Sequence, residues 1–270
     1  MKATENSNIY SSFPWTNIRI VLVETSHPGN IGGAARAMKN MQLESLFLVN
    51  PEKFPDDHAI ARASGATDIL ENAVVTSTLA EALVGCRLVV AASARRRSIR
   101  WPSLSAEEAA RELAGQAQHS PVALVFGRED SGLNNEELDH AHAMVQLPAN
   151  PEFSSLNLAA AVQVFSYELR KTIIRMGNSS EEQQSDTDSS AGDSLASSDS
   201  LMRLFTHMEK TLLMVHFMPD HRARTLMRKI MRFFYRSRIT EEEVNIFRGI
   251  ISELERVALK SGELDRDSSP

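Results

Sequence analysis

Short aliphatic runs alternate with helix-like stretches between residues 18 and 176. The stretches between the runs, such as "AEEAARELAGQAQ", place apolar residues at the spacing of an amphipathic helix. Continuous apolar strands separated by helices are typical of a parallel sheet that is buried on both faces. The pattern therefore predicts an α/β domain with a parallel sheet and helices on both faces. The expected strands are residues 18–23, 45–50, 87–93, 121–127 and 143–148, and a long helix capped by Ser154 or Ser155 is expected over 154–176.

The pattern changes after residue 176. Residues 177–200 are mainly Ser, Asp, Glu and Gln, and a segment of this composition buries too little apolar surface to order itself. Helical periodicity returns at residue 201, with Pro219 between two helices and a capping box formed by Thr240 and Glu243. We expect a flexible segment 1–17, the α/β domain 18–176, an acidic linker 177–200, a basic helical module 201–260 and a flexible tail 261–270.

Charge is distributed unevenly along the chain. The formal net charge of the 270 residues is −6, and the six acidic residues of the linker account for all of it. Residues 201–239 contain nine basic and two acidic residues, a net charge of +7. The net charge of the whole chain therefore does not reveal the basic module, because the acidic linker offsets most of its charge.

One helix of this module combines a basic and an apolar face. A spacing of four residues puts four arginines on one side, and apolar residues occupy another. The arrangement predicts one face for packing and one for RNA, with a protein partner or an anionic membrane as alternatives. The basic positions are Arg224, Arg228, Arg232 and Arg236, and the apolar ones are Met227, Ile230, Met231 and Phe234.

A second basic stretch, "ASARRRSIRWP", follows a predicted strand. Arginines beside the aromatic ring of Trp101 can bind phosphates and stack on a base, so RNA contact is expected here, with a solvated loop as the alternative. Its arginines are Arg95, Arg96, Arg97 and Arg100.

Several classes of protein are disfavoured by what the sequence lacks. Cys86 is the single cysteine, so no internal disulfide can form, and a reducing cytoplasm and a place in the core are expected. No signal peptide and no apolar run of membrane-spanning length is seen. His140 and His142 lack the acidic or cysteine partners of a metal site, so no metal is expected.

Three polar segments follow predicted strands, at the edge of an open α/β sheet where ligands bind. The first, "HPGNIGGAARAMK", contains Asn30, a candidate helix cap, and Arg36. The second, "FGREDSGL", has glycines spaced as in a phosphate-binding loop but lacks its lysine and hydroxyl, so an NTPase is rejected, and no dinucleotide fingerprint follows a strand. The third, "PEFSSLNLAAA", places serines and Asn157 at a helix start, which suits polar ligand edges.

Together and in this order, the three segments resemble the motifs of the SpoU/TrmH-like branch of the SPOUT methyltransferases. The resemblance covers residues 18 to about 175 strongly and continues more weakly in "LLMVHF" and "VNIFRGII". It implies a C-terminal trefoil knot in the α/β domain, S-adenosylmethionine as methyl donor and a homodimer whose interface helps to form the active site. The implied activity is 2′-O-methylation of cytidine or uridine at position 32 of the tRNA anticodon loop.

The resemblance also implies roles for individual residues. The catalytic set would be Arg36, Asn30, Glu129, Ser155 and Asn157, with Arg36 holding the ribose hydroxyl. Since arginine does not lose its proton in proteins, we expect it to orient the hydroxyl and stabilise the developing alkoxide, while water, a phosphate or Glu129 takes the proton. The cofactor would be held by Ala92, Ser93, Ala94, Gly127, Leu147, Ser154, Ser155 and Leu156.

Two alternatives remain open. Because the three motifs are shared across the branch, the substrate could be another tRNA position or rRNA. A non-catalytic RNA-binding module on the same scaffold is the second alternative, and cofactor binding distinguishes it from an enzyme.

Overall fold

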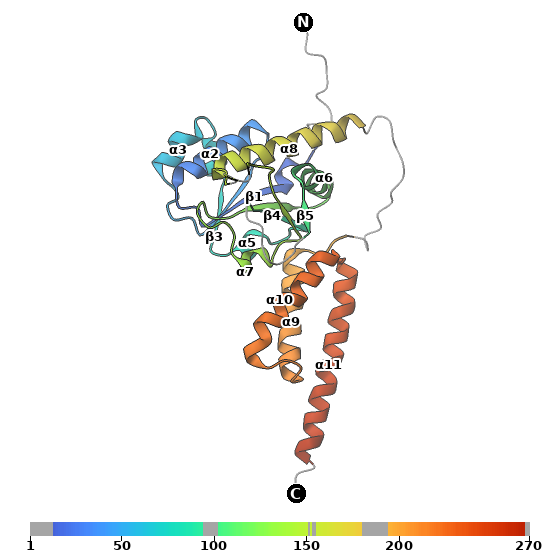
Figure 1. Ribbon diagram of the computed structural model, residues 1–270. Coiled ribbons are helices and arrows are strands. Elements are labelled where there is room, and N and C mark those ends of the chain that lie inside the picture. The colour runs from blue at the N-terminus through green and yellow to red at the C-terminus, as the bar shows by residue number, and fades with distance from the viewer. Residues whose placement is uncertain (1–12, 94–101, 151, 153–154, 180–193, 268–270) are drawn as a thin grey trace. The chain divides into compact units, whose positions relative to one another are not determined.

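The computed structural model describes residues 13–93, 102–150, 152, 155–179 and 194–267. The chain divides into two compact units, residues 1–187 and 188–270, and each is described by itself (Figure 1).

The first unit is built on a seven-stranded sheet with the order β3-β2-β1-β6-β4-β7-β5. Each pair of neighbouring strands is parallel, which confirms the predicted parallel sheet. Two strands were missed, β3 and β5, because runs of three and two residues are too short for a periodic signal. The strands are β1 (Ile18–Val23), β2 (Ser45–Val49), β3 (Val74–Thr76), β4 (Leu88–Ala92), β5 (Ser103–Leu104), β6 (Val122–Phe126) and β7 (Ala143–Val145).

Alternate residues of the strands pack into two separate cores. Ile20 and Leu22 of β1 belong to one core, whereas Val21 and Val23 belong to the other, as the two-residue period of a strand requires. Buried Cys86 lies in the second core, as expected. Helices cover both faces of the sheet, which confirms the fold class (Figure 1). The first core contains α2 (Pro28–Asn40), α3 (Asp57–Ala63), α4 (Thr67–Glu71), α6 (Ala106–Ala117) and α8 (Leu158–Ser179), with the short helix η1 (Trp15–Asn17); the second contains α5 (Leu79–Ala82) and α7 (Asn135–Leu138).

Two helices begin differently from the prediction. Asn30 does not cap α2, because the ring of His27 accepts a hydrogen bond from the N–H of Gly29 and Pro28 is the first helical residue. Helix α8 begins at Leu158, and the Asn157 side chain accepts hydrogen bonds from the N–H groups of Ala159 and Ala160. An asparagine oxygen thus fills the capping role predicted for a serine.

Glycines let α2 approach its neighbours closely. A Cβ atom on Gly32 would lie 2.1 Å from the carbonyl oxygen of Ala59 in α3. A Cβ on Gly33 would lie 2.8 Å from the Cβ of Ala159 in α8. Helix α2, which contains most of the first motif, therefore lies close to the backbone of α3 and to the Ala159 side chain of α8, at distances that a larger residue would not permit.

The second unit contains three helices, α9 (Ser198–Met214), α10 (Asp220–Ser237) and α11 (Glu241–Asp267). The expected capping box is present, since the Glu243 carboxylate accepts the Thr240 N–H at 2.7 Å and the Thr240 hydroxyl accepts the Glu243 N–H at 3.2 Å. The predicted apolar face of α10 packs into the core, where Met227 and Phe234 are buried.

The second unit includes residues from the range predicted as linker. Ser197 caps α9, and the Glu241 carboxylate accepts hydrogen bonds from the Ser197 N–H and the Ser200 hydroxyl, both at 2.8 Å. The Ala196 N–H donates to the Ile239 carbonyl, so this stretch is paired with the turn before α11. Helix α8 continues to Ser179, and α11 continues seven residues beyond the expected end at 260.

The trefoil knot stays a prediction. Within the described residues, no helix is long and apolar enough to cross a membrane.

The close approach of α2 and α3 leads to a stability prediction. Gly32→Ala should destabilise the fold by about 2–4 kcal/mol, because the new methyl group overlaps backbone atoms of α3. The control is Gly115→Ala in α6, where a Cβ meets nothing within 4 Å. That change should stabilise the protein by about 0.5–1 kcal/mol through helix propensity. Urea denaturation measures both, and equal effects of the two substitutions would contradict the packing argument.

Candidate active site

A cavity lies at the edge of the sheet where β4, β6 and β7 end. Ala92, Phe126 and Val145, the last residues of these strands, all line it. Its volume of about 480 Å³ falls within the range of small-molecule sites. The carboxyl edge of a parallel sheet is the expected place for such a site.

The cavity brings together six of the eight residues predicted to bind the cofactor, and the catalytic candidate Glu129 with them. Ala94 and Ser154 lie outside the described residues, as do the four arginines between residues 95 and 100. The rest of the lining comes from the turn after β6 and from apolar residues of β6, β7 and α8, none of which was predicted to bind the cofactor. The six predicted residues are Ala92, Ser93, Gly127, Leu147, Ser155 and Leu156.

The Glu129 carboxylate holds the first motif against the second. It accepts hydrogen bonds from the Ser26 N–H and hydroxyl, both at 3.2 Å, and from the His27 N–H at 3.3 Å. The side-chain amide of Asn30 donates to it at 2.9 Å. Ser26 and His27 are therefore site residues that the sequence reasoning missed, since both use backbone donors, which leave no signal in residue type.

These hydrogen bonds change the acidity of Glu129. Partial burial by itself raises the pKa of the carboxyl group, but the donors from Asn30, Ser26 and His27 together lower it below its ordinary value of 4.5. Glu129 is therefore ionised at neutral pH and its carboxylate is already occupied by donors, an arrangement suited to holding loops in place.

Asn157 connects the third motif to the same point. Its amide nitrogen donates to the Asn30 side-chain oxygen at 2.9 Å, while its own oxygen caps α8. A single chain of hydrogen bonds therefore runs from α8 through Asn157 and Asn30 to Glu129. It brings together residues of all three motifs, and Asn30 of the first is 99 positions from Glu129 and 127 from Asn157.

Arg128 lies between two carboxylates at the start of the turn that follows β6. It forms ion pairs with Glu24 at 2.7 Å and Glu137 at 2.9 Å. The hydrogen bonds that Arg128 donates to Glu137 and then to Glu24 outweigh burial and raise the pKa of its guanidinium above the ordinary value. None of the three residues was among the predicted site residues.

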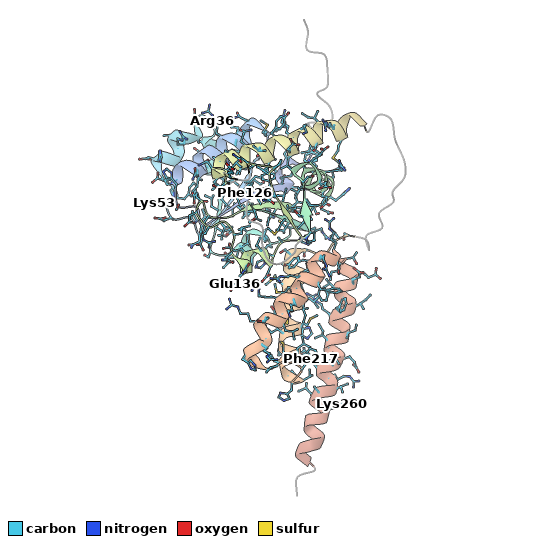
Figure 2. All side chains as sticks on the ribbon, viewed as in Figure 1. Arg36, Lys53, Phe126, Glu136, Phe217 and Lys260 are labelled. Atoms are coloured by element: carbon cyan, nitrogen blue, oxygen red, sulfur yellow. The ribbon has the colours of Figure 1, made fainter. Side chains whose placement is uncertain are left out.

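Arg36 lies apart from this cavity. It is exposed on α2, three residues beyond the contact between Gly33 and Ala159, and it is not among the lining residues (Figure 2). Figure 2 shows Arg36 at the outer side of the unit, while Phe126 lies in its interior. The cavity and the proposed catalytic guanidinium are thus on separate parts of one chain.

His140 and His142 are not among the residues that line the cavity. The His142 ring nitrogen accepts a hydrogen bond from the Val89 N–H, and burial lowers the pKa of His140. The described residues contain no group of three or more His, Cys, Asp or Glu placed to hold a metal.

Comparison with known proteins defines the class to which this fold and site belong. The sequence profile of the SpoU rRNA Methylase family matches residues 17–167, more than half of the chain. The chain therefore belongs to the SpoU methylase family, and the resemblance seen in the three motifs is confirmed. The profile of the tRNA methyltransferase TrmJ C-terminal domain matches residues 199–263.

Particular relatives resemble both units. The tRNA (cytidine/uridine/adenosine-2′-O-)-methyltransferase TrmJ of Pseudomonas aeruginosa is 49% identical over 89% of this chain and 95% of its own length. The tRNA (cytidine/uridine-2′-O-)-methyltransferase TrmJ of Escherichia coli K12 is 47% identical over 89% of this chain and 96% of its own. The crystal structure of TrmJ from Z. mobilis ZM4 has a TM-score of 0.76 at 33% identity, covering 88% of this chain and 98% of that one.

The lowered pKa of Glu129 leads to a prediction about pH. Because its folded-state pKa lies below 4.5, its hydrogen bonds stabilise the fold fully above that pH and less as the pH falls through the folded-state value. Glu129→Gln should therefore cost about 1 kcal/mol at pH 7, since solvent access weakens the interaction, and the difference from wild type should shrink near pH 3. Urea denaturation at the two pH values checks this, and a constant difference would contradict it.

Proposed function

We propose that this protein is an S-adenosylmethionine-dependent tRNA ribose 2′-O-methyltransferase. The observation that carries the proposal is a cavity lined by the second and third motifs and hydrogen-bonded to the first through Asn30, in a chain 47–49% identical to TrmJ enzymes over most of its length. The match of the TrmJ C-terminal domain to the second unit favours tRNA over rRNA. A cytoplasmic location, where tRNA is modified, is part of the same proposal.

The cavity suits S-adenosylmethionine in size and chemistry. Phe126, Phe165 and Leu147 offer an apolar surface for the adenine ring, while Gly127 lets the turn after β6 pack closely, since a Cβ there would lie 2.2 Å from the backbone of Gly132 and Leu133. Glu129 and Asp130 line the cavity and add negative charge suited to a sulfonium cation. When bound, S-adenosylmethionine supplies an electrophilic methyl group.

The chain's own residues would activate the ribose hydroxyl. The Arg36 guanidinium stabilises the negative charge that grows on the 2′-oxygen and can hold a neighbouring phosphate through its fork. Asn30, Glu129 and Asn157 keep the three motif loops in register around the site. Since Glu129 is already occupied by donors and its pKa is lowered, the proton passes more readily to water or to a phosphate.

A homodimer would bring Arg36 to a cavity. Arg36 is exposed and does not line the cavity of its own chain. Exposed apolar side chains on α8, Val164 and Tyr167, are 37% and 52% accessible, which supports a covered interface near the same helix. The active site would then combine the cavity of one protomer with Arg36 of its partner.

The exposed side of α10 is the proposed tRNA surface of the second unit. Of the four predicted arginines, Arg224 and Arg236 are exposed, whereas Arg228 and Arg232 are half-buried. Lys229 is exposed on the same helix, and so is Phe233, at 53%. Cations beside an accessible aromatic ring suit phosphates and an unpaired base.

The identity of the methylated nucleotide is the finer part of the proposal. We infer cytidine or uridine at position 32 of the anticodon loop, as the motif resemblance implies. The name of the P. aeruginosa relative also includes adenosine, so nuclease mapping of the product must identify the methylated base.

Transfer of labelled methyl groups to tRNA tests the activity and the role of Arg36 together. Wild-type protein should methylate bulk tRNA at the 2′-oxygen of nucleotide 32, located by nuclease mapping. Arg36→Ala should lower kcat by about 100-fold or more while cofactor affinity stays within about twofold. Labelling of rRNA alone would overturn the substrate, and the absence of both cofactor binding and methyl transfer would favour the non-catalytic RNA-binding module.

Mixed dimers determine whether Arg36 acts across the interface. Two variants, Arg36→Ala and Gly127→Ala, should each be inactive alone. The first lacks the guanidinium, and in the second a Cβ would lie 2.2 Å from the backbone of Gly132 and Leu133 and distort the turn that lines the cavity. Co-expressed at equal levels, they should recover about a quarter of wild-type activity if one site uses both protomers. No recovery in isolated mixed dimers would place Arg36 and the cavity in the same protomer.

The basic face of α10 predicts a salt-dependent loss of binding. Replacing Lys229 and Arg236 together by Gln should weaken tRNA binding by roughly tenfold at low salt and reduce the slope of log affinity against log salt by about two. Arg256→Gln, on exposed α11, is the matched control and should leave the slope unchanged. An unchanged slope in the double variant would exclude this face as a phosphate-binding surface.

A further inference from the structure

Arg128 is committed to holding the protein together. Its Nε donates to Glu24 at 2.8 Å, Nη2 donates to Glu137 at 2.9 Å, and Nη1 donates to Glu137 at 3.1 Å and to the Gly132 carbonyl at 3.4 Å. Its side chain is only 21% exposed. Although Arg128 lines the cavity, its N–H groups point at protein acceptors, so it is unsuited to receiving an anionic group of a ligand.

Glu24 occupies a position that is unfavourable for a residue with a side chain. Its φ angle is +47°, in the left-handed region that favours glycine. It directly follows β1, and its N–H donates to the Val49 carbonyl at 2.8 Å. Backbone strain near a ligand site is often retained because the side chain has a function. The Glu24 side chain forms an ion pair with Arg128.

Glu137 connects the same guanidinium to α7. Its carboxylate accepts the Asn134 N–H at 2.6 Å in a capping box and also binds Arg128. The two carboxylates therefore fix Arg128 between the end of β1 and the first turn of α7. Glu24 provides the link to β1 and Glu137 the link to α7.

The turn that begins at Arg128 is a wall of the cavity. Arg128 pairs with Gly132 as an isolated bridge, the Gly132 N–H donating to the Arg128 carbonyl at 3.0 Å. All residues from 127 to 132 line the cavity. The next residue, Glu129, fastens the turn to residues 26–30, so adjacent side chains of opposite charge hold it at two places. Displacing Arg128 would therefore move the backbone that faces the ligand.

We propose that Glu24 is a positioning residue for the cofactor, which acts through Arg128 to hold the turn 127–132 in its ligand-binding shape. The proposal rests on the proposed function, because it takes S-adenosylmethionine as the occupant of the cavity. Loss of the Glu24 carboxylate weakens cofactor binding but leaves the methyl-transfer step, which depends on Arg36, unchanged once the cofactor is bound.

Glu24→Gln tests the proposal, since it keeps the shape of the side chain and removes its charge. S-Adenosylmethionine affinity measured by calorimetry at 25 °C should fall about tenfold, and the KM for the cofactor should rise equally, with kcat within about twofold of wild type. Glu24→Asp, which keeps the charge, should recover part of the affinity. The matched control is Glu44→Gln, an exposed carboxylate outside the cavity lining, which should bind like wild type.

A double-mutant cycle with Arg128→Gln tests whether Glu24 acts through Arg128. If it does, the double variant should bind hardly more weakly than Arg128→Gln alone. Additive losses, wild-type affinity in Glu24→Gln, or a lower melting temperature with unchanged affinity at 25 °C would each overturn the proposal. If the wild-type protein does not bind the cofactor at all, the proposed function itself is overturned. That result differs from a Glu24→Gln variant that binds the cofactor as tightly as wild type.

Discussion

A directed chain of hydrogen bonds joins the three motif loops, and the candidate site depends on it. The backbone N–H groups at the start of α8 donate to the Asn157 oxygen, the Asn157 nitrogen donates to the Asn30 oxygen, and the Asn30 nitrogen donates to Glu129. An ionised carboxylate can only accept, so it fixes the orientation of both amides. Reversing either amide would set two acceptors or two donors against each other. The parallel sheet brings the loops to one edge, and this chain sets their register.

The same turn after β6 is held by two neighbouring residues of opposite charge. Glu129 gathers donors from residues 26–30, whereas Arg128 donates to Glu24 and Glu137. Because the two side chains bind different partners, the turn is attached both to the start of α2 and to α7. Charge-assisted hydrogen bonds, which are stronger than neutral ones, supply that rigidity here. The cavity wall therefore depends on polar contacts, whereas the sheet and long helices depend on apolar burial.

The architecture of both units could be predicted from periodicity, but much of the site could not. Five strands, the long helices and the capping box of Thr240 and Glu243 follow local rules of burial and hydrogen bonding. The roles of Ser26 and His27 could not be seen, because both donate backbone N–H groups to a carboxylate that is about 100 positions away in sequence. Arg128 resembled a surface residue in sequence, since its partner Glu24 is 104 positions away. The capping of α2 by His27 was missed because histidine is a rare cap.

Two arginines of this chain illustrate how environment decides what a guanidinium does. The charge of Arg128 is balanced by two carboxylates and its donors are directed at the protein, so it has little capacity left to stabilise a new negative charge. Arg36 is exposed on α2 with no carboxylate within ion-pair distance in the described part of the chain. Electrostatic stabilisation of an alkoxide requires a cation that is positioned but not already neutralised. A guanidinium buried beside the cavity needs carboxylate partners to offset the loss of water around its charge, as Arg128 has in Glu24 and Glu137. In the proposed homodimer, the exposed Arg36 would meet the cavity only when a second protomer and the RNA assemble, and it would so avoid that compensation.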